Sequence, residues 1–118
     1  MTRLKLKASN DWQIDLQEVR AAIRESTRYM VINEPYNPAG TLMSHQLQQE
    51  LVEIANEHGI YILSDEVYRL LEHDERDRLP AMADLYHGGL SCVTLSCALP
   101  PSNRPSASSV VAPLPDAL

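Results

Sequence analysis

The sequence predicts an α/β fold with a mostly parallel sheet, and three short apolar runs carry that prediction. They cover 29–32, 60–63 and 92–95, and segments with helical spacing separate them. Strands that alternate with helices are typical of parallel βαβ units. The second run is almost continuously apolar, as expected for a strand covered on both faces.

A helix is predicted over about 16–26, before the first strand. Asp15 stands where it can cap the helix, and Glu18 follows at the spacing of a capping box. The apolar residues recur at i, i+3 and i+7 on one helix face: Leu16, Val19 and Ile23.

A second helix is predicted over about 45–57, between the first two strands. Ser44 is the expected N-cap, and Gly59 is the expected C-terminal stop. Its buried face comprises Leu47, Leu51, Ile54 and Ala55. A short third helix is expected near 80–87, before the last strand.

Composition excludes several classes of function. The 118 residues suffice for one small domain, and a net charge of −6 without a basic patch argues against nucleic-acid binding. Cys92 and Cys97 have no spacing typical of zinc, and no apolar run approaches the length of a membrane span. We therefore expect a soluble cytoplasmic protein without a metal site. The charged segment 72–78 is predicted to be a solvated loop, and the four histidines are expected at the surface.

Two segments that follow strands carry residues suited to chemistry. Residues 37–40 read Asn-Pro-Ala-Gly, and residues 64–69 read Ser-Asp-Glu-Val-Tyr-Arg. Ligands of open parallel sheets gather at the carboxyl ends of the strands, where both segments lie. Each also has a purely structural interpretation, because Asn-Pro-Ala-Gly favours a turn and an Asp at this place often caps a helix.

Together these segments resemble the class I/II aminotransferases of the pyridoxal-phosphate-dependent fold type I. The matching stretches are N-E-P-Y-N-P-A-G, I-Y-I-L-S-D-E-V-Y-R and V-T-L-S, and the resemblance runs over about 10–96. It implies that residues 1–96 form part of a three-layer α/β/α large domain. The stretch R-L-P-A-M-A-D-L-Y is also similar to the branch that contains capreomycidine synthase.

The resemblance implies a cofactor, pyridoxal 5′-phosphate, and roles for four residues. Asp65 matches the carboxylate that pairs with the protonated pyridine nitrogen. Asn37 and Tyr68 match the donors to the ring oxygen O3′, and Thr94 matches the hydroxyl that binds the phosphate. The bond before Pro38 is often cis in the family.

One position departs from the family pattern. The residue after Leu-Ser should be the lysine that bonds covalently to the cofactor and then moves protons, but this chain has Cys97. The only lysines, Lys5 and Lys7, lie at the other end of the chain in a segment without family motifs. We therefore expect no catalytic residue and no activity from the chain alone.

Other parts of a complete enzyme are also missing from the resemblance. The glycine-rich phosphate loop and the aromatic that stacks on the ring belong upstream, and the arginine for the substrate carboxylate belongs to a C-terminal domain. Family members act on an amino acid and a 2-oxo acid, and their active sites form across a homodimer interface. The chain is accordingly expected to be a fragment that folds poorly by itself.

Composition changes abruptly at residue 97. Residues 97–118 are rich in proline and serine, almost uncharged, and without helical or strand periodicity. This predicts a disordered tail. A sharper hypothesis is a frameshift, because the family pattern ends within one residue of the change. A family-like continuation in another reading frame of the gene is the expected result.

Three functional interpretations remain open from the sequence. The first is a fragment of an aminotransferase, inactive alone. The second is a fragment of a lyase or cyclase that uses the same cofactor, since the ring-binding residues do not distinguish these reactions. The third is a non-enzymatic remnant that binds a protein partner.

Overall fold

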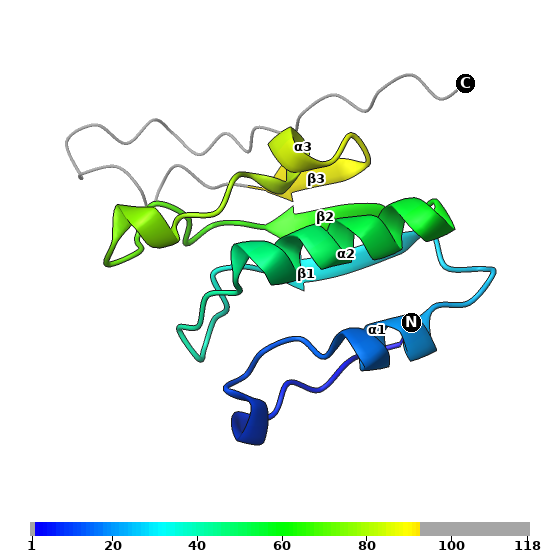
Figure 1. The fold of residues 1–118 in the computed structure, drawn as a ribbon, viewed down its shortest axis with the longest axis horizontal. Coiled ribbons are helices and arrows are strands. Elements are labelled where there is room, and N and C mark those ends of the chain that lie inside the picture. Colours follow the sequence, from blue (N-terminus) through cyan, green and yellow to red (C-terminus); the bar gives the residue numbers. More distant parts are fainter. Residues whose placement is uncertain (1, 93–118) are drawn as a thin grey trace.

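The computed structural model describes residues 2–92 of the chain. Its elements alternate as predicted (Figure 1). In order they are the 3₁₀-helix η1 (Ala8–Asn10), α1 (Leu16–Ala22), β1 (Tyr29–Asn33), α2 (His45–His58), β2 (Tyr61–Asp65), the 3₁₀-helix η2 (Glu75–Asp77), α3 (Met82–Leu85) and β3 (Gly89–Cys92). The predicted tail, 97–118, lies outside the described residues.

The three strands form one parallel sheet in the order β1-β2-β3, which confirms the predicted fold class (Figure 1). In the register of β1 and β2, Tyr29 pairs with Tyr61 and Asn33 pairs with Asp65. The last residues of both strands therefore stand side by side at the carboxyl edge of the sheet.

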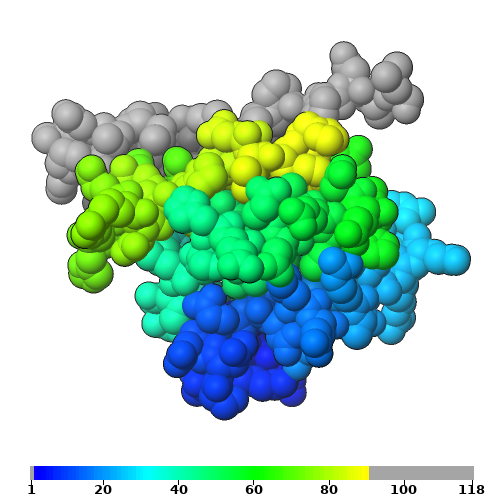
Figure 2. Space-filling model, viewed as in Figure 1, coloured from blue at the N-terminus to red at the C-terminus, as the bar shows by residue number. Residues whose placement is uncertain are grey.

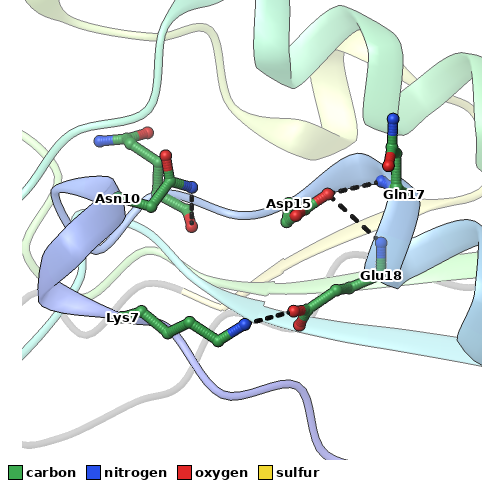
Figure 3. Close-up of polar contacts among 6 residues, drawn as sticks. Lys7, Asn10, Asp15, Gln17 and Glu18 are labelled. Atoms are coloured by element: carbon green, nitrogen blue, oxygen red, sulfur yellow. Dashed lines mark hydrogen bonds and ion pairs between the residues drawn. The ribbon is translucent and has the colours of Figure 1, made fainter.

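Helix α1 begins where predicted and ends earlier than predicted. The Asp15 carboxylate accepts from the backbone N–H of Gln17 at 2.8 Å and of Glu18 at 3.3 Å (Figure 3). The helix ends at Ala22 because Ile23 is extended, with φ −72° and ψ 136°. Beyond it the Thr27 hydroxyl accepts from the backbone N–H of Arg24, a local bond that competes with helix.

Helix α2 has the predicted caps and supplies more buried core residues than any other element between residues 2 and 92. The Ser44 hydroxyl accepts from the Leu47 N–H at 3.0 Å, and Gly59 closes the helix in the left-handed conformation at φ 62°. Its buried residues are Gln48, Leu51, Val52, Ile54 and Ala55. Figure 2 shows the N-terminal segment lying directly against this helix.

The last strand begins three residues earlier than predicted. The sequence predicts a strand over 92–95, whereas β3 spans Gly89–Cys92 and residues 93–95 lie outside the described part. Leu90 pairs with Leu63, so pairing along β2 sets where β3 begins. The preceding helix, α3, is a single turn.

Helices cover only one face of the sheet within residues 2–92. Ile32, Ile62 and Ser64 point to the covered face and are 8%, 0% and 2% exposed. The alternate residues form a bare apolar face, on which Val31 is 68% exposed and Leu63 is 38% exposed. The prediction that 60–63 is covered on both faces is therefore wrong for the described residues.

The charged segment 72–78 is mostly exposed, as predicted, and Glu72 is the exception. The Glu72 side chain is only 2% exposed, and its carboxylate pairs with the Arg78 guanidinium at 3.2 Å. Burial of an acidic group is tolerated here because the charge has a hydrogen-bonded partner. The four histidines are exposed, as expected.

The part of the chain that the structure describes offers neither a membrane-spanning helix nor a metal cluster. No helix between residues 2 and 92 is long and apolar enough to cross a membrane. No group of three His, Cys, Asp or Glu side chains in the same range is placed to hold a metal ion.

Candidate functional site

Four polar side chains meet at the carboxyl edge of β1 and β2. Asn33 ends β1 and Asp65 ends β2, and the Asn33 amide Nδ2 donates to Asp65 Oδ2 at 3.1 Å. The Asn37 amide Nδ2 donates to the Tyr68 hydroxyl at 3.0 Å. The structure thus brings together Asn37, Asp65 and Tyr68, three of the residues that the sequence predicts for the site.

Asp65 is held by two donors. Besides the Asn33 amide, the Val67 backbone N–H donates to its Oδ1 at 3.3 Å. The residue is half-buried, and strand alternation places its side chain on the bare face, in line with Tyr61 and Leu63. A turn follows Asp65 instead of a helix, so the helix-cap interpretation of this residue is wrong.

Asn37 lies in a tight loop that returns the chain from β1 to α2. The Tyr36 N–H donates to the Thr41 carbonyl at 3.0 Å, and the Gly40 N–H donates to the Tyr36 carbonyl at 2.7 Å. Gly40 adopts φ 68°, which favours glycine. The peptide bond between Asn37 and Pro38 is cis, as the family resemblance predicts.

Asn33 is a site residue that the sequence interpretation missed. Its amide donates to Asp65, and its Oδ1 accepts from the backbone N–H of Asn37 at 3.1 Å. One side chain therefore joins the carboxylate to the loop that carries the amide. The signal that points to Asp65, a polar residue at the carboxyl end of a strand, applies equally to Asn33.

The lysines at the start of the chain belong to another part of the fold. The Lys7 ammonium donates to the Glu18 carboxylate at 2.6 Å, on the segment that enters α1 (Figure 3). This contact raises the pKa of Lys7 above its ordinary value. A protonated, paired amine is a poor nucleophile, which fits the expectation that Lys7 does not replace the family lysine.

The remaining predicted site residues, Thr94 and Cys97, lie outside the described residues. Their roles stay predictions from the sequence.

Parallel strands with polar side chains gathered at the carboxyl edge define an α/β protein, and this edge is where open parallel sheets bind their ligands. Comparisons with known proteins narrow this class. Residues 1–99 match the family described as aminotransferase class I and II. The chain therefore belongs to the class I and II aminotransferase family, whose cofactor is pyridoxal phosphate and whose substrates are amino acids and 2-oxo acids.

Individual relatives agree with this assignment. The chain is 42% identical over 69 residues to glutamate-pyruvate aminotransferase AlaA of Escherichia coli K12, covering 58% of this chain and 17% of the relative. It is 35% identical over 85 residues to kynurenine–oxoglutarate transaminase 1 of Rattus norvegicus, and the match covers 68% of this chain and 20% of that relative. A PLP-dependent aminotransferase from Streptococcus suis has a similar fold, with a TM-score of 0.69 and 40% identity over 77% of this chain and 24% of that protein. The chain thus spans about a fifth of the curated relatives' length.

Proposed function

We propose that this chain forms the part of an aminotransferase cofactor site that holds the ring nitrogen and O3′ of pyridoxal phosphate. The observation that carries the proposal is the convergence of Asp65, Asn37 and Tyr68, with Asn33 linking them. A carboxylate, an amide and a phenol at the carboxyl edge of a parallel sheet suit a protonated ring nitrogen and a ring oxygen.

The donors and acceptors present fit such a ring. The Asn37 amide has two N–H groups, and its bond to Tyr68 uses one of them. The Asp65 carboxylate is fixed by Asn33 and Val67, so it is oriented before any ligand binds. When bound, pyridoxal phosphate supplies an aldehyde that takes up amino groups and a protonated ring that withdraws electrons from the reacting carbon.

In this proposal the chain's residues hold charge and orientation, and none of them transfers protons. Asp65 keeps the ring nitrogen protonated through opposite charge, and Asn37 and Tyr68 donate to the ring oxygen. Cys97 stands where the family has its lysine, and a thiol does not replace an amine in covalent attachment or proton transfer. Amino-group transfer therefore requires residues beyond those of this chain.

Replacing Asp65 with asparagine is expected to weaken the binding of pyridoxine 5′-phosphate about 10- to 100-fold. The change keeps the size of the side chain and removes its charge, and a hydrogen bond to a charged group contributes about 1.5–3 kcal/mol. Pyridoxine phosphate is chosen because it has no aldehyde and cannot bond covalently to lysine. Isothermal titration calorimetry on the full chain measures the dissociation constant.

The matched control is Asp84→Asn, which removes one negative charge from an exposed position on α3. It is expected to bind like the unaltered chain. Equal affinities of the Asp65 variant and the unaltered chain, or no saturable binding by either, would contradict the proposal.

A further inference from the structure

We propose that Glu34 is a positioning residue whose ionisation state sets how firmly the loop 34–43 holds Asn37 against Tyr68. The contacts within the loop are present without any ligand. The inference rests on the proposed function in one respect, that a loosened loop makes Asn37 a weaker donor to the cofactor.

Glu34 closes the base of the loop. Its Oε1 accepts from the backbone N–H of Met43 at 2.7 Å, which joins the two ends of the loop. Its own backbone N–H donates to the Asp65 carbonyl at 3.0 Å, so its main chain is fixed to the end of β2. The carboxylate therefore ties the far end of the loop to the sheet.

Asn37 lies between these two tied ends. Its side chain reaches Tyr68, and its backbone N–H reaches Asn33, so both of its contacts depend on the path of the loop. The Gln13 amide also donates to the Leu42 carbonyl at 3.1 Å, next to Met43. A change in the bond between Glu34 and Met43 therefore shifts the C-terminal end of the loop and, with it, Asn37.

The Glu34 carboxyl borders a small cavity behind the loop, on the covered side of the sheet. Apolar and neutral residues supply much of its lining, including Ile32, Leu42 and Leu79. The charged groups that line it come from the segment after β2: Glu66, Arg69 and Glu72.

Each of these charged groups is engaged in another contact. Glu66 Oε1 accepts from the Met82 N–H at 2.8 Å, Arg69 Nε donates to the Leu79 carbonyl at 3.4 Å, and Glu72 pairs with Arg78. Helix α2 contributes the neutral Gln48 to this lining, and the Gln48 amide donates to the Pro80 carbonyl. The cavity lining therefore carries three carboxylates, Glu34 included, against the single cation of Arg69.

Burial raises the pKa of Glu34 to about 7, and the hydrogen bond from Met43 opposes part of that rise. Both protonation states are consequently populated near neutral pH. Ionisation strengthens the bond from Met43, because a charged acceptor binds an N–H more strongly than a neutral carboxyl does. As long as the carboxyl stays buried behind the loop, the bond between Glu34 and Met43 is thus firmer above pH 7 and looser below it.

Overall stability has the opposite pH dependence. The folded-state pKa of about 7 lies above the ordinary value of 4.5, so the folded chain binds more protons between these values. The contribution of Glu34 to the free energy of unfolding is therefore fully present below 4.5, the pKa of this carboxyl in the unfolded chain, and it is lost as pH rises through 7. After discounting for partial solvent exposure, Glu34→Gln is expected to favour folding about tenfold at pH 8 and to have little effect below pH 4.5.

The test follows two ¹H–¹⁵N resonances of the full chain, the Met43 backbone amide and the Asn37 side-chain amide, from about pH 5 to 9 without cofactor. Both signals are expected to move with one midpoint near 7. Glu34→Gln keeps an acceptor for Met43 and abolishes both titrations, whereas Glu34→Ala displaces the Asn37 signal at every pH. Glu53→Gln, an exposed site on α2, is expected to leave both titrations intact.

Three results would overturn the proposal. The first is a Met43 signal that does not titrate near pH 7 or that stays at its position in the unfolded chain. The second is a titration of either signal that persists in Glu34→Gln. The third is a Met43 titration that the Asn37 signal does not share. Because no ligand is present, failure of cofactor binding leaves this experiment unaffected.

Discussion

Replacing Gly89 with alanine is expected to lower the free energy of unfolding by about 3 kcal/mol, because the new methyl group meets backbone. A Cβ at this position would lie 2.4 Å from the Met82 carbonyl oxygen. Met82 is fully buried and Tyr86, the next turn on, donates to the Ile60 carbonyl, so pushing α3 away from β3 opens the core. Urea unfolding followed by circular dichroism measures the change.

Gly59→Ala is the matched control for this prediction. An added Cβ at Gly59 would have no atom within 4 Å, so the cost of this substitution comes from its φ of 62°. The expected cost is about 1–2 kcal/mol, the price of a left-handed L-residue. A Gly89 variant as stable as the Gly59 variant would show that β3 and α3 do not pack as described.

Replacing Cys97 with lysine is expected to give the chain a covalent bond to pyridoxal phosphate at residue 97. The family sequence pattern places an amine there, and a cofactor held at Asp65 raises the local concentration of its aldehyde. After reduction with borohydride, peptide mapping is expected to find residue 97 labelled on the order of tenfold more than Lys5. The unaltered chain supplies the baseline at Lys5 and Lys7.

The Asp65→Asn change in the same background separates site-directed labelling from random labelling. Loss of the ring contact is expected to reduce labelling at residue 97 to the level of Lys5. If residue 97 is labelled no more than Lys5 even with Asp65 present, residue 97 does not stand in the lysine position of a cofactor site.

Local signals in the sequence predicted the helices and the sheet type well. Asp15, Ser44 and Gly59 act within one turn of themselves, so their capping roles follow from the residue and its neighbours. The parallel order of the strands follows from their alternation with helices, a pattern equally visible along the chain.

Contacts between distant residues account for what the sequence did not predict. The start of β3 depends on pairing of Leu90 with Leu63, and no local signal marks it. Tyr61 and Leu63 are apolar yet exposed within the described residues, so the composition of the run does not reveal how many faces are covered.

The candidate site divides in the same way. Asp65, Asn37 and Tyr68 follow from motifs, and the structure places them together at the carboxyl edge. The parts played by Asn33 and Glu34 arise from bonds across strands and across a loop, which a linear motif does not encode.

We propose above that the carboxyl edge of β1 and β2 receives the cofactor ring. Titrating ¹⁵N-labelled full chain with pyridoxal phosphate and mapping the shifted resonances tests it most directly. We expect saturable shifts concentrated at the Asn33 and Asn37 side-chain amides and at the Asp65 and Val67 backbone amides. Shifts confined to the segment around Lys5 and Lys7, with Asn37 and Asp65 unmoved, would contradict it.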